Sequence, residues 1–220
     1  MYNLIERIKY HSDKFKELIE AQAGVSELHT DDYGWENYRY ESPLFRLAHV
    51  ERYSHMGLQV VHITCFPRKN SKAPIFGFDV VGYQNDEKQT SKISGVFIDV
   101  SPIMYEEKWH DTQWNKDRKL PVWATVFSKD FIAVRPTEDE YEKVFEVGFT
   151  AFEKYIETLN SEVDLTDDVN EIEQIIDKQN TYCKHQASNP RTYGALKANI
   201  GEEKARYFME KVLFPQIDKD

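Results

Sequence analysis

Four ionisable side chains interrupt three neighbouring segments that otherwise have the composition of β-strands. His49 and Glu51 lie two residues apart in the first segment, His62 lies in the middle of the second, and Asp79 lies in the third. Side chains two residues apart in a strand point to the same face of a sheet. Burying imidazole and carboxylate groups there is costly unless they pair or bind something. The pattern therefore predicts a polar pocket on a sheet, lined by groups that can exchange protons.

The flanking residues support the prediction of strands. Residues 58–66 are rich in Val and Ile, so His62 and Thr64 are expected on one face, and Ile63 and Cys65 on the other. Asp79 stands among Ile, Phe and Val residues in the segment 75–81. Short breaks between the strand-like segments of residues 33–100 favour an antiparallel meander over helical crossovers. These breaks fall at 42–43, 55–57, 68–74 and 84–90.

Helical periodicity characterises the two ends of the chain. Apolar residues between Leu4 and Ile19 recur at helical spacing. Thr137 and Glu140 form a capping box, in which each side chain can satisfy a backbone N–H of the other, before an apolar stripe that runs to Leu159. Further helices are expected at 168–186 and on both sides of Gly201, and two short strands at 122–127 and 131–134. Strands followed by helices predict an α+β layered sandwich.

Composition narrows the class of protein. A chain of 220 residues suits one domain, here 1–220. Two cysteines and seven scattered histidines give no disulfide framework, metal site or iron–sulfur cluster. The charged amphipathic N-terminus and the lack of long apolar stretches predict a cytoplasmic protein that spans no membrane. A net charge of -10 argues against nucleic acid and anionic membranes as partners.

The motifs for several common reactions are missing. The chain has no Gly-rich dinucleotide fingerprint, no phosphate-binding loop and no serine nucleophile elbow. An enzyme with this sequence must therefore work through carboxylate and imidazole groups or through the reactivity of its substrate. If its reaction is a redox reaction, the electrons must come from outside.

One basic cluster stands out in this acidic chain. Lys116, Arg118 and Lys119 lie close together in a segment that also holds Trp109 and Trp114. Runs of charge usually solvate a surface, so a solvated loop is the favoured interpretation. The alternative is a docking site for an acidic partner.

Four segments resemble the ferredoxin-dependent bilin reductases, closest to the phycocyanobilin:ferredoxin oxidoreductase branch and its phage relatives that make phycoerythrobilin. They are YESPLFRLAHVE (40–51), LQVVHITCFPR to PIFGFDVVG (58–82), FSKDFIAVRP (127–136), and YCKHQASNPRTYGALKANIG to FMEKVLFP (182–215). The resemblance implies a monomer with a three-layer α/β/α sandwich around a central antiparallel sheet. It implies biliverdin IXα bound between that sheet and the C-terminal helices. Reduced [2Fe-2S] ferredoxin would supply single electrons, with no bound metal or flavin.

The resemblance also suggests roles for the four polar residues. Asp79 and His62 match the family's catalytic Asp and His; a desolvated Asp79 would donate a proton to the bilin and His62 would share or relay it. Otherwise the pair only braces two strands. Glu51 matches a Glu that serves vinyl-group reduction in the phycocyanobilin-forming branch, although the turn between Glu51 and His62 is one residue shorter here; an exposed edge carboxylate is the alternative. His49 matches the neighbouring substrate-binding His.

Three further residues match positions that contact the bilin. Arg135 and Arg191 match ligands of its two propionates, because guanidinium groups grip carboxylates in paired hydrogen bonds; either could also be an ordinary surface Arg. Asn189 stands where several family members have a second catalytic Asp, so any second reduction must draw its proton elsewhere. Phycocyanobilin-type enzymes and a divergent phage branch that makes phycoerythrobilin also have Asn there. Asn189 could equally be a helix N-cap before Pro190.

The leading hypothesis is therefore a four-electron reduction of biliverdin IXα by radical proton-coupled electron transfer. The short chain, the shortened turn and a phage-like composition favour phycoerythrobilin, made through dihydrobiliverdin, over phycocyanobilin. A non-enzymatic bilin carrier or sensor is the rival class, but it would need the arginines and no proton donor. An interaction domain without a ligand would leave the polar face of the sheet unexplained.

Overall fold

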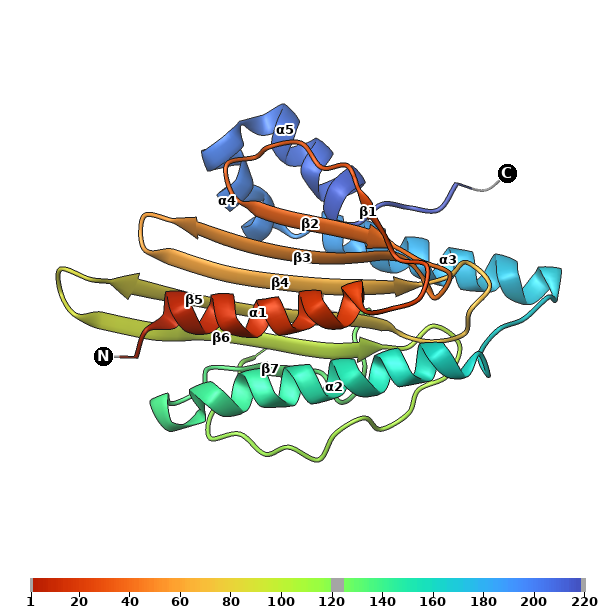
Figure 1. Cartoon of the computed structure of the whole chain (residues 1–220), viewed down its shortest axis with the longest axis horizontal. Helices are drawn as coiled ribbons and strands as arrows, with labels where there is room; N and C mark the ends of the chain where they lie inside the picture. Colours follow the sequence, from red (N-terminus) through yellow and green to blue (C-terminus); the bar gives the residue numbers. More distant parts are fainter. Residues whose placement is uncertain (1, 120–124, 219–220) are drawn as a thin grey trace.

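A seven-stranded antiparallel sheet forms the middle layer of the molecule, with strands in the order β1-β2-β3-β4-β5-β6-β7 (Figure 1). This computed structural model describes residues 2–119 and 125–218. Each strand pairs with its neighbours in the chain, which confirms the predicted antiparallel meander. The strands are β1 (Ser26–Leu28), β2 (Glu36–Glu41), β3 (Phe45–His55), β4 (Leu58–Pro67), β5 (Ile75–Asn85), β6 (Thr90–Ser101) and β7 (Ile132–Val134).

Helices cover both faces of the sheet (Figure 1). One face carries α1 (Leu4–Glu20) and α2 (Tyr141–Ser161), the latter preceded by the 3-10 turn η1 (Glu138–Glu140). The opposite face carries α3 (Val169–Ala187), α4 (Pro190–Ile200), α5 (Glu202–Tyr207) and the π-helix η2 (Phe208–Leu213). This arrangement confirms the α+β, three-layer α/β/α sandwich. None of the helices in the described part of the chain is long and apolar enough to cross a membrane.

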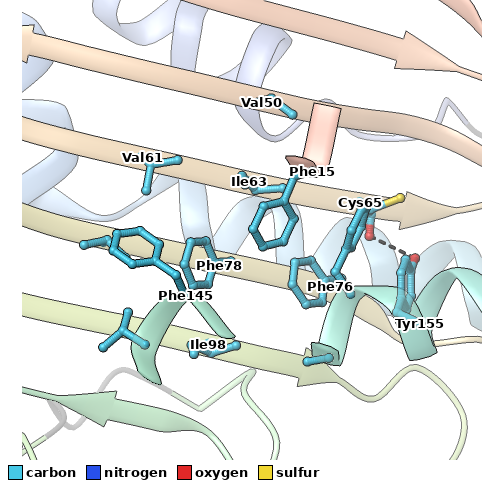
Figure 2. Packing of buried hydrophobic residues seen from close by; sticks show 14 of the residues in the cluster. Phe15, Val50, Val61, Ile63, Cys65, Phe76, Phe78, Ile98, Phe145 and Tyr155 are labelled. Atoms are coloured by element: carbon cyan, nitrogen blue, oxygen red, sulfur yellow. Dashed lines mark hydrogen bonds between the residues drawn. The ribbon is translucent and has the colours of Figure 1, made fainter. Parts of the chain in front are cut away.

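An aromatic core joins α1 and α2 to the sheet (Figure 2). Phe15 of α1 stacks on Phe78 of β5 with ring centroids 5.2 Å apart. On α2, Gly148 lies so close to Phe78 that a Cβ there would sit 2.3 Å from its ring. Apolar residues of the strands alternate, so this core takes only the side chains of one face. The opposite face of the same strands is free to carry polar groups.

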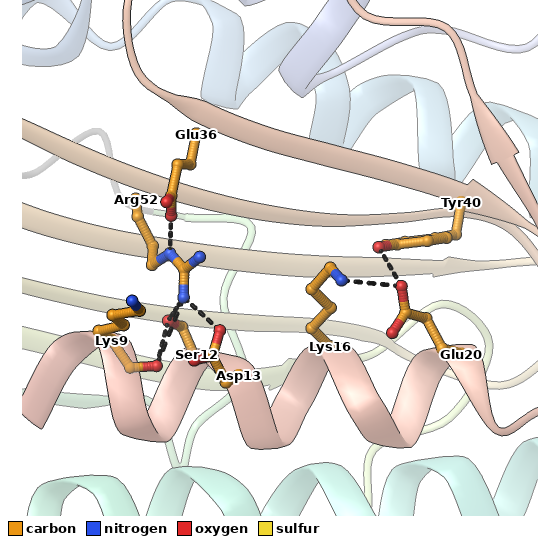
Figure 3. A network of polar contacts seen from close by, with 8 residues as sticks. All are labelled: Lys9, Ser12, Asp13, Lys16, Glu20, Glu36, Tyr40 and Arg52. Carbon is orange, nitrogen blue, oxygen red and sulfur yellow. Dashed lines mark hydrogen bonds and ion pairs between the residues drawn. The ribbon is translucent and has the colours of Figure 1, made fainter.

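A polar network fastens the outer side of α1 to β2 and β3 (Figure 3). Arg52 of β3 donates to Ser12 Oγ at 3.2 Å and forms ion pairs with Asp13 and Glu36. Further along α1, the hydroxyl of Tyr40 donates to Glu20 at 2.9 Å. Such half-exposed pairs add little stability individually. They fix where α1 crosses the sheet and confirm that Arg52 points away from the face that carries Glu51.

The structure differs from the sequence prediction in three places. The short strand β1 was not predicted, since three residues give too few positions for alternation to be visible. The strand expected at 122–127 is not found: residues 125–127 are not in a strand, and residues 120–124 lie outside the described part of the chain. The β5–β6 hairpin is longer than predicted, because its strands continue to Asn85 and from Thr90.

Candidate active site

The predicted acid–base residues form one row across the sheet. Antiparallel pairing sets Glu51 of β3 opposite His62 of β4, and His62 opposite Asp79 of β5. Directly paired residues project to the same face of a sheet. All three residues line one cavity, on the face opposite the aromatic core. The sequence pattern that predicted a polar pocket is therefore matched by a row of three neighbouring side chains.

The short turn between Glu51 and His62 keeps this row in register. His55 pairs with Leu58, so the hairpin closes through Met56 and Gly57 alone. Both turn residues have positive φ, 46° for Met56 and 86° for Gly57. Two consecutive left-handed residues form the type of turn whose twist matches that of the flanking strands. The shortened turn therefore leaves Glu51 directly opposite His62.

The cavity has a volume of about 1020 Å³ and lies between the sheet and the C-terminal helices. This is the size of a pocket for a large organic ligand. Its floor comes from β3 to β6, and its opposite wall from α3, α4 and the residues at the end of η2. Apolar and aromatic groups dominate around the polar row; they include Val60, Phe97, Phe127, Phe131, Leu196, Leu213 and Phe214.

His62 and Asp79 are directly hydrogen-bonded. The distance from His62 Nδ1 to Asp79 Oδ1 is 2.6 Å. Burial lowers the pKa of His62, but the charge and hydrogen bond of Asp79, together with the charge of Glu51, outweigh burial and raise that pKa above 6.5. The Nε2 atom of His62 is buried and has no partner among the described residues. The pair can therefore hold a proton next to the cavity.

Asp79 differs from expectation in its exposure. Its side chain is 34% exposed, on the wall of the cavity, whereas the sequence predicted a desolvated carboxyl. The reason is geometric: on this face of β5, Asp79 lies between Gly77 and Val81, and on the side of Gly77 there is no side chain of β5 to cover the carboxyl. A flat ligand lying on the sheet would cover the carboxyl and remove it from water.

Glu51 is the most deeply buried carboxyl of the row. It is 6% exposed. Burial raises the pKa of Glu51 to about 7, with a further increase from the charge of Asp79 and an opposing decrease from His62. A carboxyl that titrates near neutral pH can act as an acid. The alternative of an exposed edge carboxylate is therefore wrong.

His49 lies in the same strand but is not among the residues that line the cavity. It is fully buried, and its Nε2 atom lies 3.1 Å from Asn37 Oδ1 on β2. Burial lowers the pKa of His49 well below 6.5, and the charges of His62 and Arg39 lower it further. A neutral His49 must donate from Nε2 to the amide oxygen, so Asn37 sets its tautomer. Sequence reasoning missed Asn37, which lies opposite Glu51.

Six of the described cationic residues line the cavity. Lys92 lies on β6, and the other five form what we call the rim: Lys116, Arg118, Lys119, Arg135 and Arg191. Arg135 follows β7, and Arg191 lies in the first turn of α4. Burial lowers the pKa of Arg118, and the charges of Arg191 and Arg135 lower it further, because the three guanidinium groups are close together. The guanidinium carbon of Arg118 lies 4.9 Å from the Phe97 ring centroid. This rim would bind an anionic ligand.

In the basic cluster of residues 116–119, Lys116 and Lys119 are exposed, as the solvated-loop interpretation predicted, but the backbone of the segment also pairs with the strand β7. Arg118 N–H donates to the Ala133 carbonyl at 2.7 Å, and Arg135 N–H donates to the Lys116 carbonyl at 3.1 Å. An isolated bridge between Asp117 and Val134 lies between them. The segment thus extends the sheet beyond β7 and holds Arg118 beside the cavity. Pairing between distant segments is not visible in local sequence patterns.

Comparison with known proteins shows which family the chain belongs to. The family model described as ferredoxin-dependent bilin reductase matches residues 13–215. The chain belongs to this family. Its members named in the comparison are oxidoreductases, so this reductase is an enzyme, and the family depends on ferredoxin as the electron donor.

Curated relatives of the reductase include phycocyanobilin:ferredoxin oxidoreductases from two cyanobacteria. The protein from Trichodesmium erythraeum is 29% identical over 194 residues, which cover 81% of this chain and 75% of the relative. The protein from Synechococcus sp. (strain ATCC 27144 / PCC 6301 / SAUG 1402/1) is 28% identical over 195 residues, with the same coverage.

Solved structures show the same fold. PcyX superimposes with a TM-score of 0.65 at 21% identity, covering 97% of this chain and 99% of that chain. Tomato phytochromobilin synthase in complex with biliverdin gives a TM-score of 0.68 at 17% identity, covering 95% of this chain and 82% of that chain.

Asn189 of the reductase begins α4. Its side-chain oxygen accepts from Arg191 N–H at 3.0 Å, and Pro190 occupies the first helical position. The N-cap interpretation is therefore confirmed. Asn189 also lines the cavity, so the same residue caps α4 and faces the cavity. Its amide can donate a hydrogen bond but has no acidic proton to give.

The sequence analysis missed several polar residues of the cavity, among them Asp99 of β6 and Tyr182 of α3. Asp99 follows Phe97 by two positions in a strand, so alternation alone places both on one face. Tyr182 lies within the helix predicted at 168–186. It is buried and also forms part of the cavity wall.

Proposed function

We propose that this reductase converts biliverdin IXα by four electrons to phycoerythrobilin, through a dihydrobiliverdin intermediate. The observation that carries the proposal is the row of Glu51, His62 and Asp79 on the floor of a cavity of about 1020 Å³. An enzyme that reduces a carbon–carbon double bond must deliver protons as well as electrons. Burial raises the pKa of Glu51 to about 7, and the pKa of His62 is raised above 6.5, so these two groups can hold protons near neutral pH, and His62 is hydrogen-bonded to Asp79.

The chemistry follows from the substrate. A conjugated tetrapyrrole can hold an unpaired electron, so the protein needs only to bind it, orient it and protonate it. Each double-bond reduction consumes two electrons and two protons. Reduced ferredoxin gives the electrons one at a time. In the first reduction Asp79 donates a proton to the radical, His62 shares and returns that proton through their 2.6 Å contact, and Glu51 supplies the second proton of the same double bond.

The arginines orient the substrate. The two propionates of biliverdin lie at the rim, where Arg135 and Arg191 bind them in paired hydrogen bonds. This places the conjugated system over the polar row and covers Asp79. The convergence of cationic groups in a chain of net charge -10 supports this assignment.

Ferredoxin would approach the same rim. Lys116 and Lys119 are exposed there and provide positive charge for an acidic partner. An electron donor docked at this rim would stand next to the bound bilin. Electron transfer would then need no bound cofactor between the two proteins.

The product assignment depends on the short hairpin at Met56 and Gly57, which favours phycoerythrobilin. Phycocyanobilin is the second candidate, and the names of the curated relatives favour it. Asn189 is compatible with both products. A carrier or sensor would have no use for an acid next to the bilin, so the row at Glu51, His62 and Asp79 argues against that class.

The decisive experiment is anaerobic incubation of the purified protein with biliverdin IXα, ferredoxin and a reducing system. Absorption spectra are followed over time, and products are separated by chromatography against phycoerythrobilin and phycocyanobilin standards. We expect a bound-bilin spectrum that converts to phycoerythrobilin. Conversion to phycocyanobilin would replace the product assignment. Binding without conversion, in an assay in which a known reductase is active, would favour a carrier.

A further inference from the structure

The four-electron reaction leaves one proton donor unassigned. The row of Glu51, His62 and Asp79 lies on one part of the cavity floor, and Asn189 on the opposite wall has no acidic proton. If the proposed function is right, a second acid must reach the bilin from another position. Any such acid must lie on the cavity wall, be shielded from bulk water, and be free of a cationic partner that would keep it ionised.

Asp99 of β6 meets these conditions. Asp99 pairs with Gly77 of β5, and Phe97, two residues earlier in β6, pairs with Asp79. Asp99 and Asp79 are therefore diagonal neighbours on the same face of the sheet. Because Gly77 has no side chain, nothing from β5 covers the space between the two carboxyl groups. Asp99 lines the cavity but is only 2% exposed.

The hydrogen bonds of Asp99 come from neutral groups. Oδ2 accepts from the hydroxyl of Ser101 and, at 3.1 Å, from the backbone N–H of Ser128; Oδ1 accepts from the hydroxyl of Ser128. The backbone N–H of Val100 is a further donor to this carboxyl. No described cation forms an ion pair with Asp99. Burial raises the pKa of Asp99 to about 6, against the lowering effect of the serine hydrogen bonds.

The hydroxyl of Tyr182 lies near the strand position between the two carboxyl groups. A Cβ placed on Gly77 would lie 3.5 Å from the Tyr182 hydroxyl, so this hydroxyl lies over the glycine between them. Burial raises the pKa of Tyr182, followed by the charge of Asp99 and, more weakly, that of Asp79. The hydroxyl therefore stays protonated and can bridge Asp99 to the cavity. Among the described residues, Tyr182 is the titratable group of the opposite wall that interacts electrostatically with Asp99.

We propose that Asp99 is the proton donor for the second double-bond reduction, in place of the acid that Asn189 does not provide. The proposal rests on the proposed function. In this step the double bond gains two electrons from two molecules of reduced ferredoxin, which are oxidised. One carbon takes the proton of the Asp99 carboxyl as its C–H bond forms, and Asp99 becomes a carboxylate. The other carbon takes a proton that comes from solvent, and solvent later reprotonates Asp99.

The test is Asp99→Asn in the anaerobic assay with biliverdin IXα and reduced ferredoxin. Asn is similar in size and can still accept from a serine. We expect the first reduction to keep its wild-type rate within about twofold, and the second to slow by about 100-fold or more. The two-electron product then accumulates. Full four-electron product from this variant, or equal loss of both steps, would overturn the proposal.

Ser101→Ala and Ser128→Ala are the matched controls, since each removes a hydrogen bond to Asp99 but keeps the acid. Both variants should still form the four-electron product. Hydrogen bonds to a carboxylate favour its charged form, so removing one raises the pKa of Asp99. The pH profile of the second reduction should therefore move to higher pH, while that of the first does not. If the two-electron product accumulates in both variants, the role of Asp99 is to hold the loop at Ser128 in place. That result would overturn the proposal.

The serine variants also decide the question if Asp99→Asn fails to fold. An unchanged pH profile of the second reduction in both would overturn the proposal without any Asp99 variant. A second route is Asp99→Asn combined with Asn189→Asp, where an acid on the opposite wall should restore the four-electron product. Failure of the proposed function gives a different result, because the wild-type protein would then reduce no biliverdin at all.

Discussion

Asp79 Oδ1 lies 2.6 Å from His62 Nδ1, across the β4–β5 pair at the floor of the cavity. The same pairing continues to Glu51, so three proton-holding groups follow one line perpendicular to the strands. A flat conjugated substrate that lies on the sheet would contact all of them at once. The pairing of β3, β4 and β5 therefore decides where on the substrate each of these groups can deliver a proton.

Asp79→Asn should abolish turnover and preserve substrate binding. Asn keeps the size of the side chain but cannot donate an acidic proton, and general acid catalysis contributes about 100- to 10,000-fold in rate. We expect normal bilin binding in absorbance titrations, followed by a stalled radical on addition of reduced ferredoxin. Electron paramagnetic resonance detects that radical. Wild-type turnover in this variant would remove Asp79 from the mechanism.

Removing a rim arginine should weaken binding of the free acid of biliverdin but not of its dimethyl ester. Hydrogen bonds to charged groups contribute about 1.5–3 kcal/mol, or about 10- to 100-fold in Kd. Arg135→Gln and Arg191→Gln are each expected to lose this amount, and Arg118→Gln less, since it stacks on Phe97. Arg206→Gln on α5 is the control. Equal loss for acid and ester would show that the arginines do not bind the propionates.

Gly148→Ala should destabilise the fold. The new Cβ would lie 2.3 Å from the Phe78 ring, and that overlap costs about 1–3 kcal/mol. Gly194→Ala is the matched helical control, because no atom lies within 4 Å of its Cβ position. Replacing this exposed glycine by Ala should stabilise the helix by about 0.5–1 kcal/mol. Thermal denaturation of both variants measures the difference, and similar melting temperatures would contradict the close contact between α2 and β5.

Glu51 should make the protein less stable as pH rises. Its pKa is raised from 4.5 to about 7 by burial, so between these values the folded state binds more protons than the unfolded state. Stability then falls with increasing pH, by about 3 kcal/mol in total across this interval. Glu51→Gln removes this titration. Urea denaturation from pH 5 to pH 8 should show a flatter decline in the variant; parallel curves would mean that Glu51 is not shielded from water.

Much of the fold follows from the sequence because its signals are local. Alternation around His62 located β4 and its two faces, and helical spacing located α1, α2 and α3. The polar row was predicted as a pocket, since alternation places Glu51, His62 and Asp79 on faces that a meander brings together. The family resemblance added the arginines, which no periodicity singles out.

The remaining features depend on contacts between distant segments. The exposure of Asp79 depends on Gly77 of its own strand and on how closely α3 approaches it. The position of Arg118 depends on backbone hydrogen bonds to Ala133. Asn37 contacts His49 only because β2 pairs with β3 in that register. Local composition contains none of this information.

Reversing the charge of Lys116 and Lys119 should weaken the interaction with ferredoxin and leave bilin binding intact. Both side chains are exposed at the rim, where long-range attraction increases the rate of encounter with an acidic partner. We expect the KM for ferredoxin to rise about 10-fold in Lys116→Glu/Lys119→Glu at low ionic strength. The difference should shrink as added salt screens the charges. Lys154→Glu, exposed on α2 at the opposite face, should change the KM little. An equal effect of that control would mean that net charge, and not this rim, governs docking.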